Sequence, residues 1–243
     1  MTEAAPVLQT RDLVREVTVD GKARRIVDRI SVSFCPGCIF NILGPSGAGK
    51  SSFLRLLNRL DEPTFGEVLF EGNDYRSIAP CDLRRQIGYL FQAPYLFPET
   101  IRDNLTYASP NLTEDRIKEL LSLVSIDPAR RDEAVLNLSV GEKQRVALAR
   151  LLSTEPRVIL LDEPTAALDP SHTEKVEHTV KRLAADNRIT VVMVSHDPAQ
   201  AVRMGGRGML FVGGKLIEQA DVVDLVERPQ SEEGRRYQRR ELT

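Results

Sequence analysis

Hydrophobic positions along this chain alternate between two patterns, and the alternation predicts an α/β fold. Short, nearly continuous apolar runs typical of strands buried on both faces of a sheet occur at 39–43, 158–161 and 189–194. Apolar residues at helical spacing predict a helix over 49–60, and another helix is expected over 173–185. Strand and helix signals therefore follow one another along much of the chain.

Turn residues and further apolar segments add the remaining strands. The N-terminal stretch is expected to consist of strands and turns, with Asp20-Gly21 as a hairpin signal. Strands are also predicted over 67–71 and 86–91, and a hairpin with a Gly-Gly turn over 210–217. The tail from Pro229 is polar and charge-dense, which favours a solvated helix or a frayed end over a binding element.

The middle of the chain has a helical character. Thr113-Glu114-Asp115 predicts a helix start, because a capping hydroxyl is followed by acids at the positive end of the helix dipole. The apolar face of this helix is Ile117, Leu120, Leu121 and Val124. Asp127-Pro128 is expected to end it. We therefore predict a helical lobe over 93–152, inserted into a single α/β domain made of 1–92 and 153–243.

Composition narrows the function classes. The 243 residues are 42% hydrophobic and 28% charged, as in an ordinary globular protein. A formal net charge of -2, no Trp and 5% aromatic residues argue against a base-stacking or duplex-binding surface for nucleic acid. The start, Met1 to Pro6, lacks the apolar core of a signal peptide, and no apolar run approaches the length of a membrane span. Any membrane role must therefore come through a partner.

The segment Cys35-Pro36-Gly37-Cys38 has two interpretations. Its C-x-x-C spacing is that of a redox motif. Pro followed by Gly also suits a type II turn between the flanking apolar strands, and this interpretation is favoured.

The segment from Gly44 to Ser51 matches the phosphate-loop pattern G-x-x-x-x-G-K-[ST], with a predicted strand before it and a helix after it. Its glycines let backbone N–H groups point at an anion, and the helix N-terminus adds positive potential. Lys50 is expected to reach the β- and γ-phosphates, and Ser51 to bind Mg²⁺. The predicted nucleotide contacts are Gly44, Pro45, Ser46, Gly47, Ala48, Gly49, Lys50, Ser51 and Ser52.

The run Val158 to Glu163 supplies two carboxylates beside that loop. Its apolar strand delivers Asp162 to the carboxyl end, where this side chain is expected to hold Mg²⁺ through water. Glu163 follows, and is expected to orient or activate the attacking water. Alone, such a run is also an ordinary strand end; the phosphate loop upstream favours the catalytic interpretation.

Two further polar residues end predicted strands. His196 follows an apolar strand and is placed at the same sheet edge as Asp162, where its imidazole would hydrogen-bond a γ-phosphate. The alternative is a surface histidine near a helix cap. Gln92 would complete the Mg²⁺ shell or hold the attacking water, and alone it is an unremarkable strand-end residue. His172 and His178 have no supporting context and are expected to be solvated.

In their order and spacing, these motifs resemble the nucleotide-binding subunits of ABC transporters over nearly the whole chain. The segments that carry the resemblance are GPSGAGKS, Gln92, LSVGE at 138–142, VILLDEP, Ala167-Leu168-Asp169 and His196. The resemblance implies an α/β P-loop NTPase fold with a RecA-like core, an antiparallel β arm and an inserted α-helical subdomain. It also implies an ATPase that uses ATP and Mg²⁺ and dimerises on binding ATP. Such a subunit docks on an integral membrane permease, peripherally and on the cytoplasmic side, and binds no nucleic acid.

The segment LSVGE at 138–142 matches the signature of the family, which is implied to contact a second chain. Ser139, Val140, Gly141 and Glu142 are implied to close on ATP held by the phosphate loop of another copy. The Ser hydroxyl, the small Gly and the following helix N-terminus suit a γ-phosphate. The family pattern is LSGGQ, so Val140 and Glu142 are departures, and the charge of Glu142 is expected to weaken ATP-driven closure. Asp169 would lie at the dimer seam.

Two parts of the family pattern leave alternatives. The window from Val14 to Val17 lacks the aromatic residue that stacks on adenine, so Arg15 by a cation–π contact or Val17 by packing would replace it. The membrane partner would dock beside Gln92 near Pro94 to Phe97; this apolar group is otherwise plain lobe packing.

The branch of the family stays open. LSVGE with RVALARLL, LLDEPTAALDP and VVMVSH is similar to ATPase subunits of small two-component systems, which include the plant aluminium-tolerance half-transporter and bacterial systems assigned to iron export. LRRQIGYLFQAPYLFPETIRDNLTY also resembles phosphate-importer ATPases. The first is favoured. The competing class is a soluble, non-transport ABC ATPase that acts on nucleic acid or protein complexes.

Overall fold

Two sheets organise the part of the chain that the computed structural model describes, residues 5–19, 21–166, 168–187 and 189–242. The larger sheet has the order β10-β9-β3-β8-β7-β6; its strands from β9 to β6 are parallel and β10 pairs antiparallel at the edge. The smaller sheet, β2-β1-β4-β5, is antiparallel. Asp20 and Ala167, named in the sequence motifs, lie outside the described residues.

The strands and helices alternate through the core as the apolar pattern indicates. The strands are β1 (Leu8–Val19), β2 (Lys22–Phe34), β3 (Ile39–Leu43), β4 (Phe65–Phe70), β5 (Asn73–Asp74), β6 (Ile87–Leu90), β7 (Val158–Asp162), β8 (Thr190–Val194), β9 (Arg207–Val212) and β10 (Lys215–Asp221). The helices are α1 (Lys50–Leu57), α2 (Pro80–Gln86), α3 (Ile101–Ala108), α4 (Glu114–Leu123), α5 (Val140–Leu152), α6 (Pro170–Asn187), α7 (Pro198–Met204), α8 (Val222–Glu227) and α9 (Glu232–Gln238). Short 3-10 turns occur at Tyr75–Ser77, Pro128–Arg130 and Val135–Asn137.

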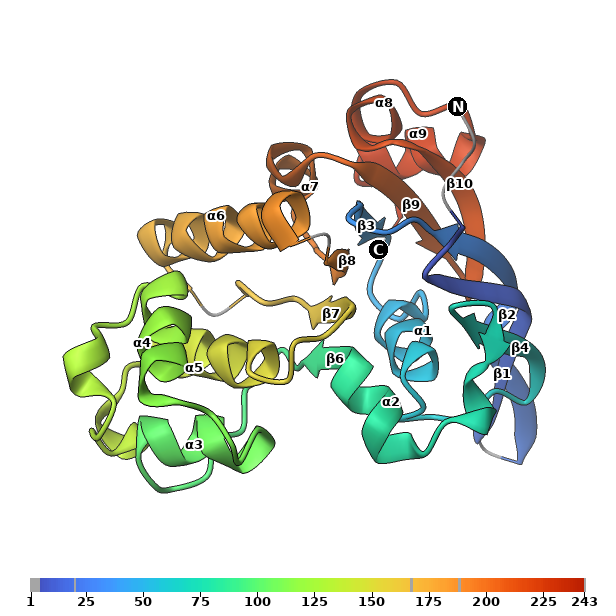
Figure 1. Ribbon diagram of the computed structural model, residues 1–243. Helices are drawn as coiled ribbons and strands as arrows, with labels where there is room; N and C mark the ends of the chain where they lie inside the picture. The colour runs from blue at the N-terminus through green and yellow to red at the C-terminus, as the bar shows by residue number, and fades with distance from the viewer. Residues whose placement is uncertain (1–4, 20, 167, 188, 243) are drawn as a thin grey trace.

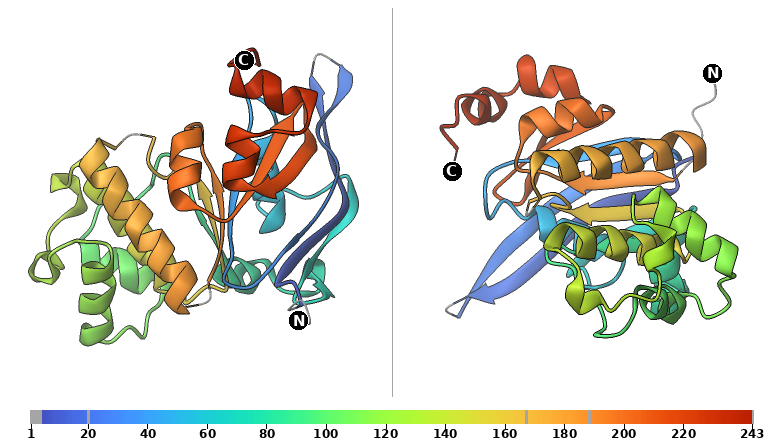
Figure 2. Two further views of the ribbon diagram at one scale, coloured as in Figure 1. Left: turned by 90° about the horizontal axis from the view of Figure 1, so that it is seen from above. Right: turned by 90° about the vertical axis from the view of Figure 1, so that its left-hand side faces the viewer.

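The central strands divide the apolar core between the two faces of the larger sheet. Ile159 and Leu161 of β7 pack with helices α3 to α6, whereas Val158 and Leu160 pack with α1 and the antiparallel arm. Side chains alternate across a strand, so a continuous apolar run serves both faces. Figure 1 shows the helices α3 to α5 on one side of this sheet and the arm on the other. Figure 2 shows that α8 and α9 form a separate cover near β9 and β10.

The helical middle of the chain forms from the expected signals. The Thr113 side chain accepts a hydrogen bond from the backbone N–H of Arg116 and caps α4, and Ile117, Leu120 and Leu121 are buried beneath it. The helix ends at Leu123, earlier than the expected stop at Asp127-Pro128, because Ser125 adopts a positive φ of 57°. Helices α3 to α5 all fall within 93–152, although the division into core and lobe stays a prediction.

Two other boundaries and the packing of the tail differ from expectation. Helix α1 ends at Leu57 rather than at residue 60, because Arg59 has a positive φ of 58°. The predicted strand 86–91 is shortened, since α2, which has Pro80 in its first turn, extends to Gln86. The tail does form a helix, α9, but it is docked rather than solvated: Tyr237 packs on the core near β9.

The Cys35–Cys38 segment is the predicted turn. Cys38 N–H donates to the Cys35 carbonyl at 3.4 Å, and Gly37 has the positive φ of 70° that a type II turn requires. The two thiols are also joined as a disulfide. In the described part of the chain, no helix combines the length and apolar character that crossing a membrane would require.

Candidate active site

The phosphate loop joins the end of β3 to α1 and depends on two glycines for its path. A Cβ at Gly44 would lie 2.0 Å from the Phe211 carbonyl oxygen, and one at Gly49 would lie 2.1 Å from that of Ile26. Both glycines also have a positive φ, of 144° and 94°. A side chain at either position would therefore displace the loop from the sheet.

Lys50 begins α1 and lies inside the loop. Its ammonium donates to the carbonyl oxygens of Gly44 at 2.7 Å and Pro45 at 2.8 Å. Burial lowers the pKa of Lys50, whereas the nearby charges of Glu163 and Asp162 act in the opposite direction. The phosphate loop thus contains a desolvated ammonium group, that of Lys50, whose hydrogen bonds to backbone carbonyls an anion could replace.

Ser51, Asp162 and Tyr89 form a connected group of oxygen atoms. The Ser51 hydroxyl donates to Asp162 Oδ1 at 2.8 Å, and the Tyr89 hydroxyl donates to Asp162 Oδ2 at 2.8 Å. Each oxygen of this buried carboxylate therefore has its own donor. Sequence reasoning did not find Tyr89, because its strand shows it only as an apolar residue facing the core.

Glu163 is held between two residues from other strands. Gln92 Nε2 donates to Glu163 Oε2 at 3.0 Å, and His196 Nε2 contacts Glu163 Oε1. Glu163 itself has a positive φ of 49° and its N–H donates to the Val194 carbonyl. The carboxyl ends of β6, β7 and β8 thus bring together three side chains far apart in sequence, at the sheet edge where ligands bind in such folds.

Glu163 and His196 face a cavity of about 430 Å³ beside the phosphate loop, which Gln92 and Asp162 do not line. Its lining consists of Arg24, Ile26, Ser46, Gly47, Ala48, Gly49, Lys50, Ser51, Ser52, Glu163 and His196. Arg15 and Val17 do not line it, and the Arg15 guanidinium instead donates to the Glu62 carbonyl at 2.9 Å. The predicted adenine contacts, Arg15 and Val17, lie on β1. Val17 pairs with Arg24 across the hairpin, and it is β2 that lines the cavity.

The signature forms a capping box at the start of α5. The Ser139 hydroxyl accepts the Glu142 N–H at 3.2 Å, and the Glu142 carboxylate accepts the Ser139 N–H at 2.9 Å. Glu142 also forms a 2.5 Å ion pair with Arg130. The hydrogen bonds from Arg130 and Ser139 lower the pKa of Glu142 to about 2. The Glu142 charge, which was expected to weaken ATP-driven closure, is therefore paired with a cation of the same chain.

The signature lies apart from the chain's own phosphate loop. Ser139 is exposed, Val140 is 57% exposed, and neither lines the cavity at the loop. A Cβ at Gly141 would lie 3.3 Å from Leu168 Cδ2, so this glycine lets the helix approach the segment before α6.

Asp169 caps α6 and holds a histidine. Its carboxylate accepts the backbone N–H groups of Ser171 and His172, at 3.0 and 3.1 Å, and its Oδ2 lies 2.5 Å from His172 Nδ1. The hydrogen bond from His172 is the main reason that the pKa of Asp169 is lowered. His172, expected to be solvated, is therefore half-buried and paired, whereas His178 is exposed as expected.

The apolar group after Gln92 divides into exposed and packed parts. Tyr95 is 69% exposed, but Leu96 packs against the core and Phe97 packs on Tyr107, with ring centroids 4.2 Å apart. The guanidinium of Arg150 donates to the Tyr95 carbonyl at 2.7 Å and fixes the turn. Tyr95 alone of the three predicted residues is thus exposed.

Comparison with known proteins decides the family. The family model described as "ABC transporter" matches residues 27–166. The chain belongs to this family. It is an ATP-binding, ATP-hydrolysing cassette, and the resemblance, the fold class and the ATPase activity inferred from the motifs are confirmed.

Its relatives include a plant protein and a phosphate-import ATPase subunit. Protein STAR1 of Oryza sativa subsp. japonica is 42% identical, over 88% of this chain and 63% of that protein. The chain thus spans less than two thirds of this relative's length. The phosphate import ATP-binding protein PstB of Mycobacterium intracellulare is 36% identical, over 96% of this chain and 88% of that protein. A solved structure, a dimeric post-hydrolysis state of the ATP-binding cassette MJ0796 bound to ADP and Pi, matches with a TM-score of 0.79 and 28% identity, over 88% and 98% of the two chains.

Proposed function

We propose that two copies of this chain enclose two ATP molecules and drive a separate membrane subunit by closing and reopening. The observation that carries this proposal is the separation of the signature from the chain's own phosphate loop. Ser139 and Val140 are exposed and do not line the cavity beside Lys50. A second copy would supply the missing signature, in keeping with the dimeric state of the cassette MJ0796.

The phosphate loop binds ATP in this proposal. Backbone N–H groups of 46–51 face the phosphates, and Lys50 exchanges its carbonyl contacts with Gly44 and Pro45 for phosphate oxygens. The exchange is favourable because a buried ammonium gains full counter-charges. Arg24 and Ile26 are the cavity residues from β2. The aliphatic part of the Arg24 side chain and the Ile26 side chain provide an apolar surface for the adenine.

The donor set around Ser51 fits Mg²⁺. The described residues include no group of three or more His, Cys, Asp or Glu side chains able to hold a metal ion. Mg²⁺ does not need one, since it prefers one or two protein oxygens together with phosphates and water. Ser51 and Asp162 would hold the ion, and Gln92, which is bonded to the adjacent Glu163, would complete its shell. When bound, Mg²⁺ neutralises charge that develops on the phosphates.

Glu163 acts as the base toward the attacking water. Its two oxygens are held by different residues, Gln92 and His196, which fixes the carboxylate plane at the cavity wall. A fixed carboxylate accepts the water proton without first reorganising. His196 lines the same cavity and would hydrogen-bond the γ-phosphate as it leaves.

The membrane subunit docks beside Gln92, which places the chain peripherally, on the cytoplasmic side. Phe91, Tyr95 and Tyr107 are exposed aromatic side chains there, around a hollow between α2, α3 and α5. Gln92 follows Phe91 directly, so movement at the docking surface would reach Glu163 through one hydrogen bond.

For the transported material, we propose metal-related export or tolerance of the aluminium and iron type. The support is the similarity of LSVGE, RVALARLL and LLDEPTAALDP to the small two-component systems, together with 42% identity to Protein STAR1 against 36% to PstB. Import of phosphate is the second candidate, because the match to PstB covers 96% of this chain.

Copurification tests the transport proposal against a soluble role. The chain, expressed in its own cells with an affinity tag, should retain a multi-span membrane protein, and Tyr95→Asp should lose it. Val19→Asp, which alters an exposed apolar residue on the arm, is the matched control and should retain it. Recovery without any membrane protein, together with ATP hydrolysis stimulated by DNA, would instead support the soluble class.

A further inference from the structure

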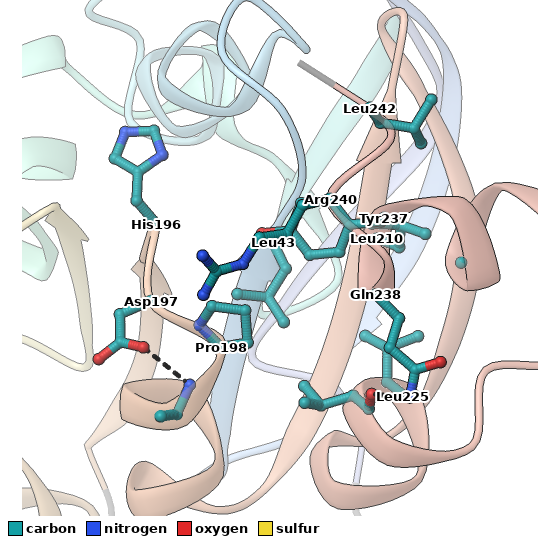
Figure 3. Close-up of a pocket in the computed structure, with 13 residues that line it drawn as sticks. Leu43, His196, Asp197, Pro198, Leu210, Leu225, Tyr237, Gln238, Arg240 and Leu242 are labelled. Carbon is teal, nitrogen blue, oxygen red and sulfur yellow. Dashed lines mark hydrogen bonds between the residues drawn. The ribbon is translucent and has the colours of Figure 1, made fainter.

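A second cavity, of about 560 Å³, lies behind the phosphate site. Its walls come from the loop before α7, from α8 and α9, and from the segment after α9, while the ends of β3 and β9 form its base (Figure 3). Of its lining residues, His196 also lines the cavity beside the phosphate loop. Its volume falls within the range of small-molecule sites, roughly 300–1,000 Å³.

The base and sides of this rear cavity are apolar. Leu43, Leu210 and Leu225 are almost fully buried and form its base. Pro198 and Leu242 extend the apolar surface toward its mouth. An apolar body placed here would cover the partly exposed Pro198, Val226 and Leu242, which favours binding by roughly 25 cal/mol per Å² of apolar surface removed from water.

One cation faces the rear cavity without a partner. The side chain of Arg240 extends from the segment after α9 toward Pro198 (Figure 3). Among the described residues, no carboxylate pairs with this guanidinium. The neighbouring Arg239 differs, because it lies 3.6 Å from Glu241. Asp197, the acid in the lining, already accepts the Ala199 N–H at 2.9 Å and lies 3.7 Å from Arg203.

We propose that the rear cavity binds an amphipathic monocarboxylate, with its apolar body against Pro198, Val226 and Leu242 over the leucine base and its carboxylate on Arg240. A planar guanidinium matches a carboxylate with two parallel hydrogen bonds. A single charge suits the site better than two, because one guanidinium faces the cavity and the acidic Asp197, next to Pro198, also lines it.

The rear cavity adjoins the catalytic groups at two points. His196 contacts Glu163 and lines both cavities. Tyr237 lies against the first residue of the phosphate loop: burial raises its pKa, and the Gly44 backbone acts on its hydroxyl in the opposite direction. Because His196 is shared by the two cavities, an anion held by Arg240 would act on the rate of ATP hydrolysis through this residue.

Decanoate is the probe, measured by titration calorimetry on the full chain without nucleotide. We expect saturable one-to-one binding with a Kd of about 10 μM to 1 mM. Arg240→Gln should weaken it about ten-fold, the effect of one charge-assisted pair. Arg239→Gln is the control and should leave it unchanged. Decanol, which lacks the carboxylate, should bind the natural protein and Arg240→Gln with equal affinity. Absence of saturable decanoate binding, or equal loss in both variants, would overturn the site.

ATP turnover tests the coupling separately. Decanoate should change the hydrolysis rate about two-fold or more, half-maximally near its measured Kd, and Arg240→Gln should shift this response to higher concentration. A rate that stays constant while decanoate saturates the protein would overturn the coupling. Because binding is measured without ATP, failure of the proposed ATPase mechanism would leave the binding result readable.

Discussion

The Glu142 carboxylate lies 2.5 Å from the Arg130 guanidinium, beside the signature that a second chain would use. Glu142 also closes the capping box with Ser139. The negative charge of Glu142, which departs from the family pattern, is thus stabilised both by the N-terminus of α5 and by Arg130. This pairing lets Ser139 approach a phosphate without a free carboxylate beside it.

Removing Arg130 should therefore impair ATP hydrolysis. We expect Arg130→Ala to lower the rate about two- to five-fold, because Glu142 at the helix terminus loses its cation, as does Glu133, the second partner of Arg130. The Arg130→Ala and Glu142→Gln double variant should recover most of the loss, because Gln keeps the capping box without the charge. Steady-state ATPase assays measure both.

Arg116→Ala is the control for this pair. It breaks ion pairs with Glu119 and Glu155, away from the signature, and should leave the rate unchanged. If the double variant were no faster than Arg130→Ala, charge compensation would not explain the pairing.

The lowered pKa of Glu142 also predicts how stability depends on acid. A carboxyl whose pKa falls from 4.5 to about 2 on folding stabilises the native state above pH 4.5. This contribution is lost as pH falls toward 2. The stability advantage of the natural protein over Glu142→Gln, measured by urea unfolding, should shrink across this interval. An advantage of constant size from pH 6 to pH 2.5 would contradict the assignment.

Tyr89 should matter for Mg²⁺ rather than for ATP. Its hydroxyl orients the Asp162 oxygen that Ser51 does not hold. Tyr89→Phe should raise the half-saturating Mg²⁺ concentration about ten-fold or more, as loss of a supporting hydrogen bond does at metal sites. Tyr107→Phe, at an exposed ring, is the control. Unchanged Mg²⁺ dependence in Tyr89→Phe would refute this role.

The Cys35–Cys38 disulfide should be dispensable for activity. It closes the turn before β3, at the end of the sheet opposite Asp162. The Cys35→Ser and Cys38→Ser double variant should hydrolyse ATP at the natural rate, with or without reductant. Loss of a thiol-dependent activity in that variant would restore the redox interpretation of C-x-x-C.

Local signals predicted much of the fold and of the site. The cap at Thr113, the glycines at 44 and 49, and the apolar run of β7 each act within a few residues, so sequence alone exposes them. The strand ends also placed Gln92, Glu163 and His196 at one edge, because parallel strands share their carboxyl ends.

What the sequence did not show depends on pairing between distant segments. Arg24 reaches the site because it pairs with Val17 across the hairpin. Tyr89 reaches it because its position along β6 brings its hydroxyl to Asp162. Arg130 meets Glu142 across a loop of no regular period. None of these contacts produces a regular pattern in the sequence, so they become visible only in the folded structure.

Mixing two inactive variants tests most directly the claim that each ATP site is built from two chains. Lys50→Ala removes the ammonium of the phosphate loop, and Ser139→Arg blocks the signature. In a mixed dimer both defects fall on one site, which leaves the other intact. We expect each variant alone to be inactive and an equimolar mixture to recover roughly a quarter of the natural rate, since half the dimers carry one good site. A mixture that stays inactive at every ratio would contradict the shared site.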